Sequence, residues 1–257
     1  MSDVTARLAP NKWFPRAPLA EASARLFCIP YSGCGAMMYR QWPDSYRGID
    51  FCRLQPPGRE NRFNEPIFAT YQDMAAALAD AVEPYLDVPY GFFGHCGSAL
   101  AAYEVSAEIE RRGWPTPSSL FISSQVAPQD GPTGRWLVMN RSELNDELDK
   151  MTIAMGGTPI PDLSDVYLDI LEEDIAANKR YVMPDPQRLA TPITTIGWSE
   201  DIEVDHRHMG GWTACGTRTS CSSTARTSAS SVRRRTSSRP SPRACRPLHE
   251  TRVSIEG

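Results

Sequence analysis

The sequence predicts an α/β fold, with a mainly parallel sheet and helices on both faces. Short apolar runs at 25–29, 49–54, 90–93, 119–123 and 192–197 have the length of buried strands. Helical patterns separate them: residues 70–86 place apolar side chains on one face, and residues 100–112 follow a sharp turn. Strands that alternate with helices favour a parallel sheet. With 257 residues, 41% of them apolar, the chain can fill one large core.

The composition narrows the classes of function. A net charge of -4 gives no reason to expect nucleic acid as a partner. Residues 1–25 contain no apolar block of signal-peptide length and no later run approaches a membrane span, so we expect a cytoplasmic protein without membrane contact. The seven cysteines form no C-x-x-C pair, which favours free thiols and predicts neither a disulfide framework nor a metal site.

Residues 90–105 have the pattern of a strand, a sharp turn and a helix, with the turn at Gly94-His95-Cys96-Gly97-Ser98. The G-x-S-x-G nucleophile motif has this arrangement, in which small residues hold the nucleophile in a strained conformation above the sheet. Here Cys96 takes the nucleophile position and Ser98 replaces the last glycine. A thiol is more acidic than a hydroxyl, and the helix N-terminus favours the thiolate, so Cys96 is predicted to be catalytic. The alternative is a small buried cysteine with a structural role.

A small-residue loop, Pro30-Tyr-Ser-Gly-Cys-Gly35, follows the first predicted strand. Such a loop can present backbone N–H groups to an anion, although by itself it would be interpreted as an ordinary turn. Beside the nucleophile turn it becomes the expected second half of an oxyanion hole, whose donors would be the N–H groups of Ser32 and Gly97.

Three segments in order, Phe27-Cys-Ile-Pro-Tyr-Ser-Gly-Cys-Gly35, Gln55-Pro-Pro-Gly-Arg-Glu-Asn-Arg62 and Phe93-Gly-His-Cys96, resemble the type II thioesterases. These stand-alone α/β-hydrolases accompany polyketide and nonribosomal peptide synthetases. The resemblance covers about residues 13–212, and the block 55–62 is its most discriminating part. It implies an α/β-hydrolase fold and hydrolysis of acyl groups on the phosphopantetheine arm of an acyl or peptidyl carrier domain. Pantetheine belongs to the substrate, so no cofactor is expected, and we expect a monomer.

The insertion at about 125–190 is predicted to be a helical lid. It contains helical patterns at 142–151 and 163–181 around the break Gly156-Gly-Thr-Pro159, and the family resemblance implies a lid in the same place. Two helices that only pack on the core are the structural alternative. The acidic positions Glu172, Glu173 and Asp174 are expected on a solvated face.

The turn Trp198-Ser-Glu-Asp-Ile-Glu-Val204 follows a late strand, which is where a hydrolase triad places its acid. Asp201 matches the family's acid in position. Glu200 and Asp205 are close enough along the chain to be rivals.

No histidine of the chain occurs in the expected context after a last strand. The four histidines are His95 before the nucleophile, His206 and His208 near the acid, and His249 in the tail. From residue 213 the composition changes to Ser, Thr and Arg, so the sequence predicts a hydrolase domain at 1–212 and an irregular tail at 213–257, either disordered or out of frame.

A frameshift explains more about this tail than a basic interaction segment does. Read one base earlier, codons 219–228 can encode Asp-Val-Leu-Leu-Val-Asp-Gly-Ala-His-Phe, a strand followed by the expected histidine over Thr227. Without that histidine two other functions stay open. One is acyl transfer to an amine or alcohol through a cysteine acyl-enzyme, and the other is a catalytically impaired carrier-binding module.

Overall fold

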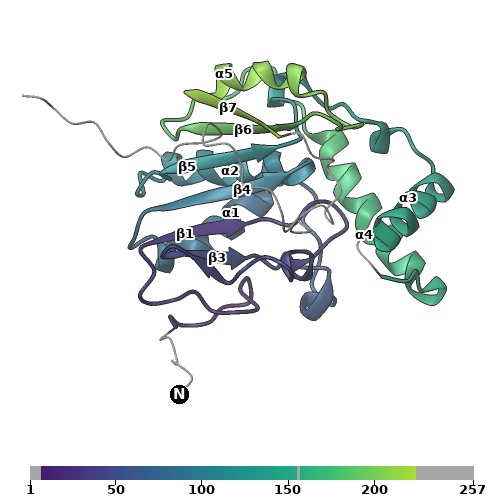
Figure 1. Cartoon of the computed structure of the whole chain (residues 1–257), viewed down its shortest axis with the longest axis horizontal. Helices are drawn as coiled ribbons and strands as arrows, with labels where there is room; N and C mark the ends of the chain where they lie inside the picture. The colour runs from purple at the N-terminus through teal and green to yellow at the C-terminus, as the bar shows by residue number, and fades with distance from the viewer. Residues whose placement is uncertain (1–6, 155–156, 224–257) are drawn as a thin grey trace, which may run out of the picture.

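The structure is a computed structural model that describes residues 7–154 and 157–223. Its centre is a seven-stranded sheet in the order β2-β3-β1-β4-β5-β6-β7 (Figure 1). Every pair of neighbours is parallel except β2 with β3, which confirms the mainly parallel α/β sheet. The strands are β1 Ala24–Cys28, β2 Ser45–Tyr46, β3 Ile49–Arg53, β4 Tyr90–His95, β5 Ser119–Ser123, β6 Ile193–Trp198 and β7 Arg218–Ser223.

Five α-helices and six 3-10 helices lie in the described ranges of the chain. The α-helices are α1 Tyr71–Val82, α2 Gly97–Arg111, α3 Arg141–Ala154, α4 Pro161–Arg180 and α5 Trp212–Cys215. The 3-10 helices are η1 Ala36–Tyr39, η2 Glu60–Arg62, η3 Glu83–Tyr85, η4 Pro128–Asp130, η5 Arg135–Leu137 and η6 His206–Gly211. The first long helix begins after Thr70, whose side chain accepts a hydrogen bond from the N–H of Asp73.

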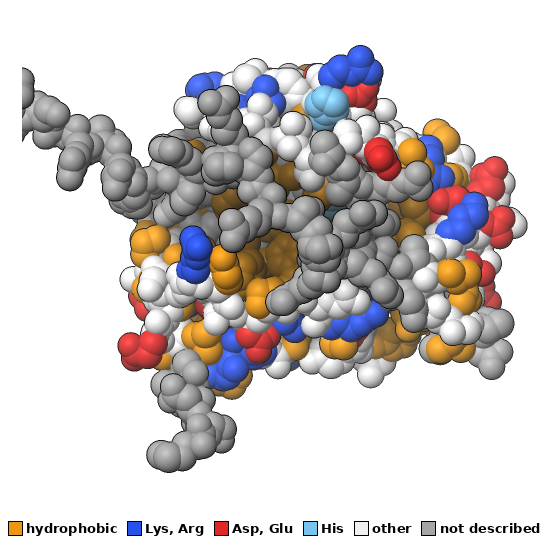
Figure 2. All heavy atoms as spheres, viewed as in Figure 1, with side chains coloured by type: hydrophobic (Ala, Val, Ile, Leu, Met, Phe, Trp, Pro, Cys, Tyr) orange, Lys and Arg blue, Asp and Glu red, His pale blue; other side chains and the backbone are white. Residues whose placement is uncertain are grey.

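The two faces of the sheet differ in their cover. Helices α1 and α2 pack side by side on one face, behind the strands in Figure 1, and fully bury aromatic side chains such as Phe27 and Phe92. On the second face Tyr39 and Trp42 pack against Phe93 of β4. Five apolar side chains of the strands on this second face are only half-buried, and hydrophobic atoms surround a hollow there in Figure 2. They are Leu26, Phe51, Phe93, Phe121 and Ile196.

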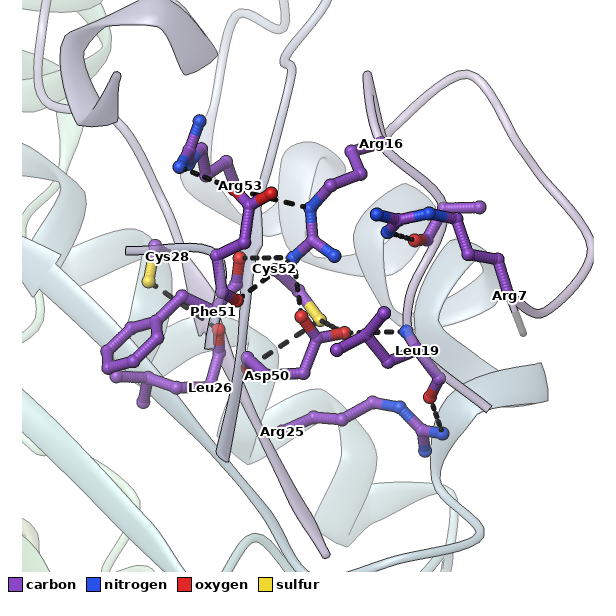
Figure 3. Close-up of polar contacts among 12 residues, drawn as sticks. Arg7, Arg16, Leu19, Arg25, Leu26, Cys28, Asp50, Phe51, Cys52 and Arg53 are labelled. Carbon is purple, nitrogen blue, oxygen red and sulfur yellow. Dashed lines mark hydrogen bonds and ion pairs between the residues drawn. The ribbon is translucent and has the colours of Figure 1, made fainter. Parts of the chain in front are cut away.

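A buried polar cluster fastens the N-terminal arm to the sheet (Figure 3). Asp50 of β3 is fully buried and accepts hydrogen bonds from the Leu19 N–H, at 2.7 Å, and from the Arg16 guanidinium. Arg25 of β1 donates to the carbonyl oxygens of Leu19 and Tyr85, at 3.1 and 2.9 Å. The buried carboxylate is therefore paired with a guanidinium and an N–H group, as its burial requires.

Helices α3 and α4 lie together beyond the carboxyl ends of the strands (Figure 1), close to the ranges predicted for the two insertion helices. They form a small hydrophobic core of their own, made of Leu144, Leu168, Leu171 and Ile175. In parallel sheets the loops that bind ligands follow the carboxyl ends of the strands. The insertion is therefore placed to cover a site there.

Regular structure continues past residue 212, where the sequence predicts the end of the hydrolase domain. Trp212 and Cys215 of α5 are fully buried, and β7 pairs in parallel with β6 along its whole length. The apolar pattern missed this strand because ladder hydrogen bonds come from the backbone, whatever the side chains are. Residues 224–257, which include the predicted histidine position over Thr227 and His249, lie outside the described residues.

Candidate active site

The nucleophile turn has a strained backbone at Cys96, between β4 and α2. Its φ of 54° and ψ of -136° lie in a region that L-residues rarely adopt. Gly94 allows the strand to approach the helix, because a Cβ there would lie 2.3 Å from the Ser98 carbonyl oxygen. Ser98 fits in place of the motif's glycine because its buried hydroxyl accepts from the His95 N–H, at 3.0 Å, and donates to the His95 carbonyl, at 2.9 Å.

The Cys96 thiol is protonated at neutral pH. Burial is the largest cause, and it raises the pKa of Cys96 to about 11. A hydrogen bond from the Gly97 N–H lowers this pKa, while the carboxylates of Glu203 and Asp201 raise it further. The helix N-terminus thus supplies the donor that the sequence predicted, but desolvation outweighs it. A base must therefore take the proton before Cys96 can react quickly.

The loop after β1 lies close to the N-terminus of α2, where the two predicted oxyanion donors belong. A Cβ built on Gly97 would lie 3.0 Å from the Ser32 hydroxyl oxygen, 2.8 Å from Tyr71 Oη and 3.3 Å from Asn178 Nδ2. Asn178 Nδ2 also donates to Tyr71 Oη at 3.2 Å. The loop after β1, helix α1 and helix α4 therefore meet at Gly97, next to the predicted nucleophile. Sequence analysis missed Tyr71 and Asn178, because neither lies in a recognisable motif.

The block 55–62 forms the internal support of the loop after β1. Gln55, which is fully buried, accepts a hydrogen bond from the Ala36 N–H at 2.9 Å. Glu60 accepts from the Met37 N–H at 3.1 Å, and Arg59 donates to the Cys34 carbonyl oxygen at 3.2 Å. These bonds give this discriminating sequence block a physical role, which is to hold the loop that carries Ser32.

Asp174 does not lie on a solvated face, which corrects one expectation from the sequence. It forms a two-point ion pair with Arg59, at 2.7 and 2.9 Å, and accepts from the Gly33 N–H at 2.8 Å. Its neighbour Glu173 is exposed, as expected, and Glu172 pairs with Arg141 at the surface. Helical periodicity identifies an acidic face but not a partner 115 positions away.

Asp201 lies on the turn after β6, and both its carboxylate oxygens are hydrogen-bonded. Oδ1 accepts from the N–H groups of Glu203 and Val204, at 2.8 and 3.2 Å. Oδ2 accepts from the hydroxyl of Ser124, at 2.5 Å. Ser124 has a φ of 49°, which is uncommon for a residue other than glycine. Sequence analysis missed Ser124, whose strained backbone aims its hydroxyl at the predicted acid.

The two rival acids are placed less favourably. Asp205 caps η6 and pairs with Arg207, which holds the pKa of Asp205 well below its usual range. Glu200 is exposed. Asp201 is thus the candidate whose negative charge raises the pKa of both Cys96 and His95.

None of the three described histidines hydrogen-bonds to Asp201 or Cys96. His95 Nδ1 lies 2.9 Å from the Ser123 hydroxyl, and burial lowers the pKa of His95 to about 4. His206 stands beside Asp205 with its Nδ1 at 3.6 Å, and His208 is exposed. In the part of the chain that the structure describes, the predicted nucleophile and acid are present without an imidazole base between them.

A small cavity lies between α2, α4 and the loop after β5. It has a volume of about 10 Å³, roughly enough for one water molecule, and lies where Leu100, Gln125, Asn178 and Tyr181 meet. Over residues 7–154 and 157–223 no three His, Cys, Asp or Glu side chains cluster in a way that could bind a metal ion.

Comparisons with known proteins identify the family of this chain. The sequence model of the Thioesterase domain family matches residues 24–222. The chain is 30% identical over 211 residues to the gramicidin S biosynthesis protein GrsT of Aneurinibacillus migulanus, covering 79% of this chain and 80% of GrsT. It is similar to the solved structure of the RedJ thioesterase from the prodiginine pathway of Streptomyces coelicolor, with 29% identity, a TM-score of 0.68 and coverage of 79% and 83%. The type II thioesterase BorB from the borrelidin cluster shares the fold, with a TM-score of 0.72, 22% identity and coverage of 85% and 91%.

Proposed function

The chain belongs to the Thioesterase domain family and is a thioester hydrolase, and we propose that it removes wrong or stalled acyl groups from the phosphopantetheine arm of a carrier domain. The strained Cys96 beside the supported loop 31–37 is the observation that carries this proposal. The names of the relatives favour the same setting, since GrsT belongs to gramicidin S biosynthesis and RedJ to prodiginine biosynthesis. The synthase served would make a polyketide or a nonribosomal peptide.

In the proposed reaction Cys96 becomes acylated. Its thiolate attacks the thioester carbonyl, a new S–C bond forms, and the bond between the carbonyl carbon and the pantetheine sulfur breaks. The proton lost by Cys96 leaves on the pantetheine thiol. The N–H groups of Ser32 and Gly97 would hold the oxyanion, and water would then hydrolyse the acyl-cysteine to a free acid and restore the thiol.

Asp201 is proposed to orient the histidine that should complete this site. Its Oδ1 is occupied by two backbone N–H groups and its Oδ2 by Ser124, so the carboxylate is held in a fixed direction. A carboxylate held in this way keeps an imidazole in the correct tautomer and orientation. In the absence of that imidazole, acylation depends on the small thiolate fraction of a thiol with a raised pKa.

The proposed partner is an acyl or peptidyl carrier domain, and we propose that the protein acts as a cytoplasmic monomer without cofactor, nucleic acid or membrane. Across the described residues no helix is both long and apolar enough to cross a bilayer. The net charge of -4 gives no electrostatic attraction to nucleic acid.

Acyl-enzyme trapping tests the proposal. After incubation with an acyl-pantetheine, mass spectrometry should find the acyl adduct on the peptide that contains Cys96, and Cys96→Ala should lose it. Cys96→Ser should keep the fold and some hydrolysis, because serine has this role in the motif. An adduct on Ser98, or undiminished labelling of Cys96→Ala, would contradict the assignment.

Substrate comparison separates the competing functions. Acyl groups on a carrier domain should be hydrolysed faster than p-nitrophenyl esters, whereas faster ester turnover would indicate a general esterase. Product formation with added amines or alcohols would indicate an acyltransferase. Carrier binding without any adduct would indicate a binding module.

A further inference from the structure

Helix α4 presents one stripe of side chains to the loop after β1. Leu171 packs on Gly33, whose added Cβ would lie 3.3 Å from Leu171 Cδ1. One turn further, Asp174 accepts from the Gly33 N–H, and another turn further Asn178 reaches the surroundings of Gly97. This spacing of three and four residues puts all three on one face of the helix. The insertion thus forms one wall of the candidate oxyanion hole.

The Arg59–Asp174 pair is the strongest contact of this stripe. Arg59 is 5% exposed, and its guanidinium binds both oxygens of Asp174 and also the Cys34 carbonyl oxygen. If α4 moved away, a buried guanidinium would lose its counterion, and the Gly33 N–H would lose its acceptor. The loop conformation that presents Ser32 therefore depends on α4 being in place.

We propose that Asp174 is a positioning residue that couples the position of α4 to assembly of the oxyanion hole, so that Cys96 is acylated efficiently only when α4 is docked against the loop after β1. This inference rests on the proposed function. Asn178 on the same helix lines a small cavity with Leu100 and Tyr181, so a movement of α4 would also change the space beside this stripe. Undocking of α4 would break the Asp174 contacts and displace the Ser32 N–H, and docking would restore both.

The test compares Asp174→Ala and Asp174→Asn in the full chain with Glu173→Gln as the matched control, because Glu173 is the exposed neighbour on the same helix. The maximal rate of Cys96 acylation by acyl-pantetheine should fall on the order of 100-fold in Asp174→Ala, the scale of a displaced catalytic group. The concentration for half-maximal rate should change little. Asp174→Asn keeps an acceptor for Gly33 but loses the ion pair, so its rate should fall less. Glu173→Gln should equal the unchanged protein.

Hydrogen–deuterium exchange provides a second measurement that needs no activity. In Asp174→Ala the peptides covering 31–37 should exchange faster, while those covering α2 should not. An unchanged acylation rate, or faster exchange spread evenly over the sheet, would overturn the positioning role. If the unchanged protein forms no acyl-enzyme, the proposed function fails, and exchange in the loop still decides whether Asp174 positions it.

Discussion

At the scale of single residues, the protonation of Cys96 would set the speed of the proposed first step. Its pKa of about 11 lies well above neutral pH, so each unit of pH below that value removes about nine-tenths of the thiolate. The two nearby carboxylates, Asp201 and Glu203, act in the same direction as burial. The proposed nucleophile is therefore held in its unreactive thiol form until a base takes its proton.

Alkylation of Cys96 by iodoacetamide should accelerate with pH. A raised pKa means that the thiol form persists above neutral pH, so the rate should rise about tenfold per unit between pH 7 and 10. Peptide mass spectrometry follows Cys96 separately from the other cysteines, and Cys96→Ala shows the background. A rate that levels off below about pH 9 would mean that some group in the protein lowers the pKa.

His95 should make the protein sensitive to mild acid. Its pKa in the folded state is about 4, against an ordinary value of 6.5, so between these values the unfolded chain binds more protons. Stability should therefore be lost as pH falls from 6.5 to 4, by about 3 kcal/mol from this residue. Urea unfolding across this range measures the loss. His95→Asn keeps a polar group toward Ser123 and should show a clearly smaller loss, whereas parallel curves would contradict the assignment.

At the scale of elements, the nucleophile turn depends on a close approach between β4 and α2. The Cβ of an alanine at 94 would meet backbone atoms of Ser98 and Ala99, at 2.3 and 2.6 Å, and backbone cannot rotate away. The strand and helix can meet at this distance only because residue 94 has no side chain.

Gly94→Ala should therefore destabilise the protein by about 1–3 kcal/mol or more and slow the acylation of Cys96. Gly210→Ala is the matched control, because an added Cβ there meets nothing within 4 Å. Thermal unfolding of the two variants gives the comparison. Equal melting temperatures would show that β4 and α2 can separate without cost.

At the scale of the whole molecule, two findings concern the end of the chain. The strand β7 occupies residues 218–223, the place where the re-read frame predicts a strand, although its present side chains are Arg, Thr, Ser and Cys. The second face of the sheet also keeps half-buried aromatic side chains such as Phe93 and Phe121. An apolar last strand would pack better at the position of β7, and a following helix would cover the half-buried aromatic side chains of the second face.

A frame-corrected chain should hydrolyse carrier-bound thioesters faster than the chain as given. It would carry Asp-Val-Leu-Leu-Val-Asp-Gly-Ala-His-Phe at 219–228 with its natural continuation, and so would supply both the apolar cover and the histidine. A positioned general base contributes roughly 10²–10⁴-fold, so carrier thioester turnover should rise by about that factor. The chain as given should acylate slowly and deacylate more slowly still. Turnover assays of both proteins measure this difference, and limited proteolysis compares the segment 224–257 that follows β7.

Equal turnover by the two proteins, or a protease-resistant Ser/Arg tail, would refute the frameshift. His206 and His208 would then be the first residues to mutate in the search for another base. Resequencing the coding DNA across codons 205–230 tests the frameshift directly.

The sequence alone determined the parallel sheet, the turn at Cys96, the two insertion helices and the position of Asp201. These features follow from local patterns, because strand and helix periods, small residues at a sharp turn and the order of motifs are all visible within short segments. The tertiary structure decided the rest. The pairing of Asp174 with Arg59 and Gly33 joins segments more than a hundred positions apart, and the direction of the Cys96 pKa shift depends on how deeply the thiol is buried. The strand β7 is held by backbone hydrogen bonds, which leave no apolar period in the sequence.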